Sequence, residues 1–159
     1  MGAMMSVEQQ KVLVRRVFEE AFNQGAVDVI DEVVASDGVD HQQPDEPSFR
    51  EHLKDVVRAM REAFPDLHFE IVQMLGEGEW VASYSIMTGT QTGALRPPLL
   101  PAGGPMMIPP TGRPVRVAHM HMIRFERGRN TELWHVMDMI AMLGQLGLMP
   151  APEAAVGRE

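Results

Sequence analysis

The chain has 159 residues, the size of a single domain with one hydrophobic core. It contains no cysteine, which excludes disulfides, thiolate nucleophiles and cysteine-ligated zinc and is consistent with a cytoplasmic protein. The net charge is −8 without a concentrated basic cluster, and no run reaches the roughly 20 apolar residues that span a bilayer, so neither nucleic acid nor a membrane is an expected partner.

The N-terminal residues 1–5 read as a vector remnant or a disordered start, and they are left out of the fold prediction. The first helix is expected to begin after Ser6, which is spaced from Gln9 as in a capping box. Apolar residues then recur at helical spacing until Gly25, which supplies a stop signal.

A short helix and a longer one follow, separated by an extended piece. Apolar spacing predicts the short helix over 27–34 and the extended piece over 39–42. A second capping box, Ser48 to Glu51, opens the longer helix, and Pro65 ends it because proline cannot continue the hydrogen-bond ladder.

From Leu67 onward apolar and polar residues alternate, which is the pattern of half-buried strands. Hairpin turns are predicted at 76–79 and at 127–128, where glycine allows the backbone of a tight turn. The predicted strands run from 67 to the first turn and over 80–92, 115–125 and 131–138.

The order of elements, helices first and then a meander of antiparallel strands, predicts an α+β fold in a single domain. The helices should cover one face of a curved sheet and leave a pocket between the two layers. Residues 94–114 contain seven prolines and are predicted to form a loop. A short helix over 140–146 closes the domain, and the tail over 151–159 is expected to be disordered.

Histidine and methionine are concentrated in the last strands. His119 and His121 are two residues apart and point to the same face of one strand, either into a pocket or toward a subunit-facing surface. Methionine occurs 14 times, ten of them from Met74 onward, and its flexible side chain suits a pocket for irregular apolar ligands, with filling of core gaps as the alternative. The histidines do not place three or four zinc ligands in one shell, so no metal is expected.

Six short motifs follow one another along the chain. They are Asp40-His41, Phe64-Pro-Asp-Leu67, Thr88-Gly-Thr-Gln-Thr-Gly93, Ile108-Pro-Pro-Thr-Gly-Arg113, Glu132-x-Trp134-x-x-x-Asp138 and Leu143-Gly-Gln-Leu-Gly147. In this combination and order they resemble the SnoaL-like polyketide cyclases, and the resemblance covers nearly the whole chain.

The resemblance implies the nuclear-transport-factor-2-like (NTF2-like) fold, a cone-shaped barrel in which N-terminal helices pack on a strongly curved antiparallel sheet and enclose a deep apolar pocket. It also implies a homodimer formed through the outer sheet face. Members close rings in polyketide intermediates of bacterial secondary metabolism without a cofactor, so a hydrophobic polyketide-type molecule is the expected partner. The fold also supports other functions, which leaves a non-catalytic carrier and an epoxide hydrolase-like or isomerase-like enzyme as alternatives.

The resemblance matches Asp138 to the aspartate that acts as general acid and base in the founding cyclases. By strand alternation Trp134 shares the face of Asp138, and His135 lies on the opposite face. The alternative is that Asp138 only caps the last helix. His121 and Tyr84 are further catalytic candidates, because both can polarise a substrate carbonyl. The substrate-binding candidates are His41, Trp134, His119, Met122, Met87, Leu99 and Met107.

The stretch 94–107 is longer than the corresponding connection in the family, and it is apolar at both ends. It is expected to be a mobile lid over the pocket, with an exposed linker as the alternative. The methionines suggest a hydrocarbon-rich substrate such as a reduced polyene. Ring closure by intramolecular 4+2 cycloaddition and closure by acid/base-assisted aldol or oxa-Michael chemistry both remain open.

Overall fold

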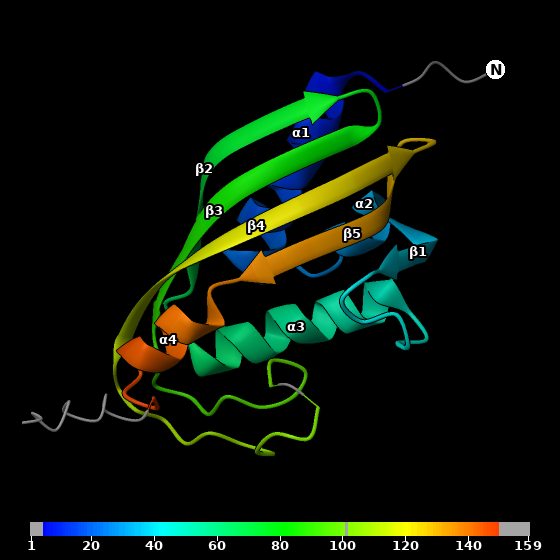
Figure 1. Ribbon diagram of the computed structural model, residues 1–159. Helices are drawn as coiled ribbons and strands as arrows, with labels where there is room; N and C mark the ends of the chain where they lie inside the picture. Colours follow the sequence, from blue (N-terminus) through cyan, green and yellow to red (C-terminus); the bar gives the residue numbers. More distant parts are fainter. Residues whose placement is uncertain (1–4, 101, 150–159) are drawn as a thin grey trace, which may run out of the picture.

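The computed structural model describes residues 5–100 and 102–149 (Figure 1). Most of the expected N-terminal remnant and the tail over 151–159 therefore lie outside the described residues. The elements in chain order are α1 (Val7–Arg16), the π-helix η1 (Val17–Phe22), α2 (Val29–Val33), β1 (Val34–Asp40), α3 (Phe49–Ala63), β2 (His68–Glu77), β3 (Trp80–Thr90), β4 (Pro114–Glu126), β5 (Arg129–Met137) and α4 (Met139–Gln145).

The strands form one five-stranded sheet in the order β1-β5-β4-β3-β2. Strands β2 to β5 are antiparallel, as predicted, but β1 pairs with β5 in parallel. The predicted antiparallel arrangement is confirmed for β2 to β5, and the structure adds two details: the edge strand β1 is parallel to β5, and the sheet does not close. No hairpin links β1 to β5; α3 and three strands separate them in the chain, so no tight turn dictates an antiparallel direction.

The helices cover one face of the sheet. In Figure 1, α1 and α2 lie behind the long strands and α3 lies below β5. The first predicted capping box is complete at Ser6 and Gln9. Of the second, only the Ser48 half forms: its hydroxyl accepts the N–H of Glu51 at the start of α3, while the Glu51 carboxylate accepts from Lys54. The α+β prediction is confirmed at the level of layers.

Both predicted hairpins are present, and their turns have the required backbone. Arg127 and Gly128 have φ values of 49° and 78°, the left-handed conformation at both central positions that matches the twist of the flanking strands. Gly78, in the turn between β2 and β3, has a φ of 58°. Between the two hairpins β3 and β4 lie inside the sheet, where the whole of β3 pairs with β4.

The π-helix η1 continues α1 and turns aromatic side chains toward the sheet. The N–H of Asn23 donates to the carbonyl of Phe18, five residues earlier, at 2.9 Å. Phe18 and Phe22 then pack against Phe69 on β2, with ring centroids 5.4 and 5.0 Å apart. This aromatic cluster forms one side of the space between helices and sheet.

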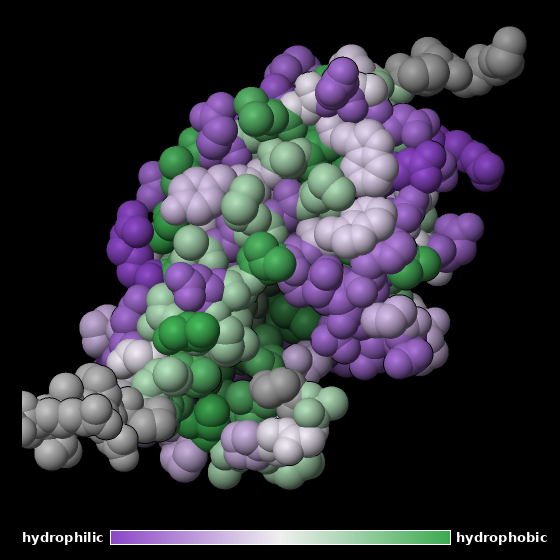
Figure 2. Space-filling view, viewed as in Figure 1, coloured by the Kyte–Doolittle hydropathy of each residue, from purple (hydrophilic) through white to green (hydrophobic). Residues whose placement is uncertain are grey.

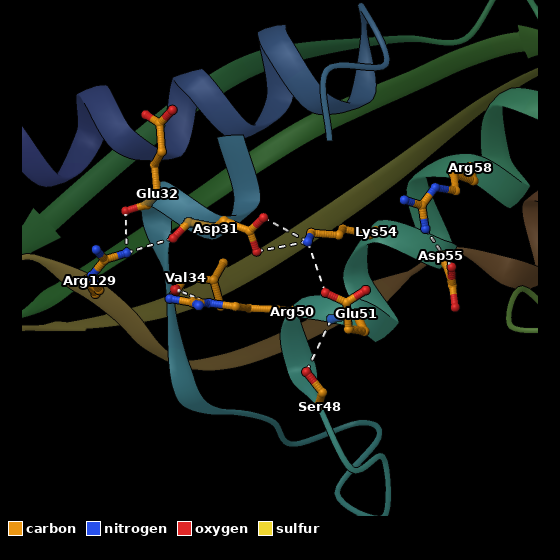
Figure 3. A network of polar contacts seen from close by, with 10 residues as sticks. All are labelled: Asp31, Glu32, Val34, Ser48, Arg50, Glu51, Lys54, Asp55, Arg58 and Arg129. Atoms are coloured by element: carbon orange, nitrogen blue, oxygen red, sulfur yellow. Dashed lines mark hydrogen bonds and ion pairs between the residues drawn. The ribbon is translucent and has the colours of Figure 1, made fainter. Parts of the chain in front are cut away.

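A polar network holds α2, α3 and β5 together on the opposite side (Figure 3). The ammonium group of Lys54, on α3, contacts the carboxylate of Asp31 on α2 at 2.8 Å and that of Glu51 at 2.9 Å. The guanidinium of Arg129, at the start of β5, donates to the main-chain carbonyls of Asp31 and Glu32 at 2.8 Å. The network fixes the helices that form the second wall of that space.

Candidate active site

A cavity of about 460 Å³ lies between the inner face of the sheet and the helices. Most of its wall is apolar, and the space-filling view shows a hollow with apolar residues inside it (Figure 2). The apolar wall includes Val17, Phe18, Leu53, Val56, Met60 and Leu133. A cavity of this size and polarity suits a small hydrophobic molecule.

A carboxylate and an imidazole meet on this wall. Asp40, the last residue of β1, is 5% exposed, and one of its carboxylate oxygens lies 3.1 Å from Nε2 of His135 on β5. The parallel register pairs Asp40 with Leu133, which brings the carboxylate next to the inward-facing His135. Gln42 supports both residues, since its main-chain N–H donates to Asp40 at 2.9 Å and its side-chain oxygen accepts the main-chain N–H of His135 at 2.7 Å.

The surroundings of Asp40 favour its charged form. Burial opposes the charge, but the hydrogen bond and charge of His135 and the N–H of Gln42 outweigh burial, and the pKa of Asp40 lies below its ordinary value. A carboxylate bonded to one imidazole nitrogen fixes the orientation of the ring and stabilises its protonated form. When Nε2 of His135 carries the proton donated to Asp40, Nδ1 is the basic nitrogen.

Two further histidines extend the polar wall along β4. The ring centroids of His119 and His121 lie 5.9 Å apart, and those of His121 and His135 lie 6.0 Å apart, with interplanar angles of 13° and 22°. The edges of Phe69 and Phe18 pack against these rings, at 5.1 Å from His119 and 5.2 Å from His121. His121 lies between the other two rings, with His119 further along β4 and His135 across on β5. Among the described residues no three His, Asp or Glu side chains converge as metal ligands would.

Burial controls the protonation of the two β4 histidines. Burial, with a smaller contribution from the neighbouring histidines, lowers the pKa of His119 to about 4 and that of His121 to about 3. Both rings are therefore neutral near pH 7. A neutral imidazole donates one hydrogen bond and accepts another, so these rings can bind a neutral oxygen without carrying charge.

The structure places the other proposed catalytic residues outside the cavity. Asp138 is exposed and accepts the N–H of Ala141 at 2.9 Å as the N-cap of α4, which is the alternative considered for it. Tyr84 is 37% exposed on the outer face of β3. The expected orientation of β5 is wrong, because His135 lines the cavity whereas Trp134 does not. Strand β5 ends at Met137, so strand alternation cannot be extended to Asp138.

The substrate-binding candidates are divided between the cavity and the outer surface. His119 and Leu99 line the cavity. His41 stacks on Trp134 on the outer face, with centroids 3.9 Å apart, and its Nε2 lies 2.9 Å from the carboxylate of Glu132. The other three candidates do not line the cavity: Met87 is buried in the core, and Met122 and Met107 are 45% and 57% exposed.

The long loop contributes to the wall. Pro98, Leu99 and Leu100 border the cavity, whereas residues 102–107 are exposed. Main-chain hydrogen bonds of 2.9 Å in both directions between Leu95 and Ile108 close the base of the loop.

Sequence reasoning missed Asp40, Gln42 and His135 as cavity residues. A usable signal was present, because Asp138 precedes the last helix at the spacing of an N-cap. Treating Asp138 as a cap ends the strand at Met137. The inward face of β5 can then be assigned from its apolar residues, which include Leu133. Because side chains two residues apart share a face, His135 lies on the same face as Leu133.

Comparisons with known proteins identify the family and the fold of the chain. A family model of SnoaL-like polyketide cyclases matches residues 12–146. Among solved structures, TsrD from Streptomyces laurentii has 21% sequence identity and a TM-score of 0.77, covering 91% of this chain and 99% of TsrD. AclR from Streptomyces galilaeus, a candidate hydroxylase, has 26% identity and a TM-score of 0.74, covering 93% and 91% of the two chains.

A third similar structure is IdmH from Streptomyces antibioticus, a candidate polyketide cyclase. It has 29% identity and a TM-score of 0.69, covering 87% of this chain and 99% of IdmH. A search of curated protein sequences gives no significant match. In the described part of the chain, no helix has the length and apolar character needed to cross a membrane. The chain belongs to the SnoaL-like polyketide cyclase family and has the NTF2-like fold of its structural neighbours.

Proposed function

We propose that this family member closes a ring in a hydrophobic polyketide intermediate without a cofactor, and that His135 transfers the proton while Asp40 orients it. The observation that carries the proposal is the buried Asp40 carboxylate 3.1 Å from His135 on the wall of an apolar cavity of about 460 Å³. Family membership supports a cyclase, and the pair supplies a base held in one orientation inside a hydrophobic site.

The proposed acid/base reaction is balanced within the site. In an aldol closure, His135 takes a proton from the carbon beside a carbonyl, and that carbon attacks a second carbonyl. The imidazolium then returns the proton to the new alkoxide. In an oxa-Michael closure, His135 takes the proton of a hydroxyl, the oxygen adds to a conjugated double bond, and the proton returns to carbon. In both cases Asp40 stabilises the imidazolium.

A 4+2 cycloaddition is the remaining subtype, and it transfers no proton. The cavity would then act by holding the reactive conformer, an effect that can be worth about 7 kcal/mol or more for well-oriented reactants. Pro98 and Leu99, in the proposed lid, would help by closing the wall around a folded chain.

The test is turnover of the intermediate that accumulates in a producing strain lacking this gene, followed by mass spectrometry and NMR with purified protein. Asp40→Asn and His135→Gln should each lower the rate of an acid/base closure by about 100- to 10,000-fold. Asp138→Asn is the matched control, because asparagine caps a helix as aspartate does, and its rate should stay at the wild-type level.

Each outcome of that experiment has a distinct meaning. An isomer formed at near wild-type rate by both variants would reject the proton-transfer role and leave a shape-driven cycloaddition. A ligand that binds and returns unchanged would favour the carrier. An epoxide hydrolase mechanism with two carboxylates and an arginine has less support, because Asp40 is the one carboxylate among the described residues that line the cavity, and no arginine lines it.

We further propose a homodimer formed through the outer sheet face, where large apolar side chains are exposed (Figure 2). Met120, Met122 and Val136 are 53%, 45% and 63% exposed on neighbouring strands β4 and β5. Contiguous apolar surface of this kind typically marks an interface. Light scattering after gel filtration should give twice the chain mass, and a Met120→Glu/Met122→Glu variant should give the monomer mass. A monomeric wild type would reject this proposal.

A further inference from the structure

The cavity contains hydrogen-bonding groups that the Asp40–His135 pair does not use. His119 is 6% exposed and lines the cavity, and its Nε2 has no hydrogen-bond partner among the described residues. The buried Nδ1 of His121, its neighbour on β4, likewise has none within that part of the chain. Buried polar atoms in proteins normally have a partner, because an unsatisfied group carries a desolvation cost.

The same polar strip continues onto β3. Ser85 pairs with His119 and Ser83 pairs with His121 across the antiparallel register, so the four side chains share the inner face. Both serine hydroxyls are buried, and neither has a hydrogen-bond partner in the described ranges. A sheet face that only needed to pack against the apolar helices would not concentrate four such groups.

We propose that His119 and His121 form a second oxygen-binding subsite, which holds a carbonyl or hydroxyl oxygen of the substrate away from the position that His135 deprotonates. This inference rests on the proposed function and names its substrate class. The substrate is a hydrophobic skeleton with oxygen functions at two separated positions. Met137 and Met139 border the cavity, whereas Met120 and Met122 are exposed and do not, so the proposed substrate combines apolar contacts with two oxygen functions.

The spacing of the rings supports two separate positions. His135 lies opposite His121, whereas His119 is two residues further along β4, opposite Met137. The centroid distances from His121 are 5.9 Å to His119 and 6.0 Å to His135, so an oxygen bound beside His119 is held away from the His135 ring. The β4 rings also stay uncharged near neutral pH, because burial lowers their pKa values to about 4 and about 3. They can therefore donate to a neutral oxygen without competing with His135 for the transferred proton.

The experiment measures binding without turnover, using naphthalene, β-naphthol and the dihydroxynaphthalenes that carry one hydroxyl on each ring. Fluorescence titration of the full chain gives the dissociation constants. The tightest dihydroxynaphthalene should bind the wild type about three- to tenfold more tightly than β-naphthol, the factor expected for one net hydrogen bond. That factor should disappear in His119→Leu/His121→Leu and persist in the matched control His41→Leu, which lies on the outer face.

A second readout on the wild type avoids dependence on the folding of the double variant. The ring-nitrogen NMR resonances of His119 and His121 should shift with a dihydroxynaphthalene and not with naphthalene. Any of three results would overturn the subsite. The wild type could bind the one-oxygen and two-oxygen probes equally well, the double variant could keep the affinity difference between them, or the ring resonances could fail to shift. Failure of the proposed function is distinguishable, because it is read from the turnover of Asp40→Asn and His135→Gln and not from probe binding.

Discussion

The neutral histidines of β4 predict a specific loss of stability in mild acid. In the folded chain the pKa of His119 is lowered to about 4 and that of His121 to about 3 by burial, against about 6.5 for an exposed histidine. At pH values between the folded pKa and the ordinary pKa, the two histidines bind protons in the unfolded chain but not in the folded chain. The two rings therefore do not reduce the free energy of unfolding above about pH 6.5, and they reduce it increasingly as the pH falls toward the folded pKa values.

The magnitude follows from the same pKa values. One pKa unit corresponds to about 1.36 kcal/mol, and integrating the proton difference from pH 7 to pH 5 gives a loss of about 2 kcal/mol for each ring. The two rings together should then cost about 4 kcal/mol over this interval. That is a large part of the 5–15 kcal/mol typical of a domain. Asp40 does not contribute here, because its pKa lies below the ordinary aspartate value and its charge is lost only at lower pH.

Urea unfolding between pH 5 and pH 7.5 measures this dependence. His121→Gln removes one of the two groups and should reduce the loss by about 2 kcal/mol, roughly half of the wild-type effect. The matched control is His68→Gln, because His68 is exposed on β2 and its ring stays in solvent in both states. A variant with the same pH dependence as the wild type would show that His121 is protonated in the folded chain, and the argument for neutral rings would fail.

Two further predictions concern the packing that shapes the cavity. Gly93→Ala would place a methyl group against the main-chain carbonyl of Glu62 in α3, and chemical denaturation should show a free energy of unfolding lower by about 2 kcal/mol or more. The control Gly144→Ala, whose added methyl group would have no atom within 4 Å, should be neutral or stabilising. Gln91→Leu removes a fully buried amide that bonds both sides of the loop base; it should lower the free energy of unfolding by about 2–4 kcal/mol and expose the loop to limited proteolysis. The control Gln73→Leu, at an exposed position, should do neither, and equal protease resistance of the two variants would contradict the role of Gln91.

Local signals in the sequence predicted most of the elements correctly. The capping box at Ser6, the stop at Pro65 and the turn at Arg127 and Gly128 each depend on residues within a few positions of one another. Caps and tight turns have fixed backbone requirements that few residue types satisfy, so a single sequence is enough to recognise them. The α+β layering then follows from the order of helices and strands.

Two features of the fold depend on long-range packing: the direction of β1, which the sequence did not predict, and the inward face of β5, which was predicted wrongly. The parallel pairing of β1 with β5 joins segments with α3 and three strands between them, and no local pattern encodes its direction. The inward face of β5 was assigned from Asp138, which lies one residue beyond the strand. Because side chains alternate strictly, that one assignment exchanged the positions of Trp134 and His135.

These two features together form the proposed catalytic pair, because Asp40 lies on β1 and His135 on the inward face of β5. The inward positions of β5 include Leu133 and His135 but no carboxylate, so an acidic partner for the imidazole has to come from a neighbouring strand. On one side the neighbour is β4, whose inward positions next to His135 carry His121 and His119. On the other side it is β1, and its parallel register places Asp40 beside Leu133, within 3.1 Å of the His135 ring. The parallel edge strand is therefore the element that supplies the carboxylate to His135, the proposed base.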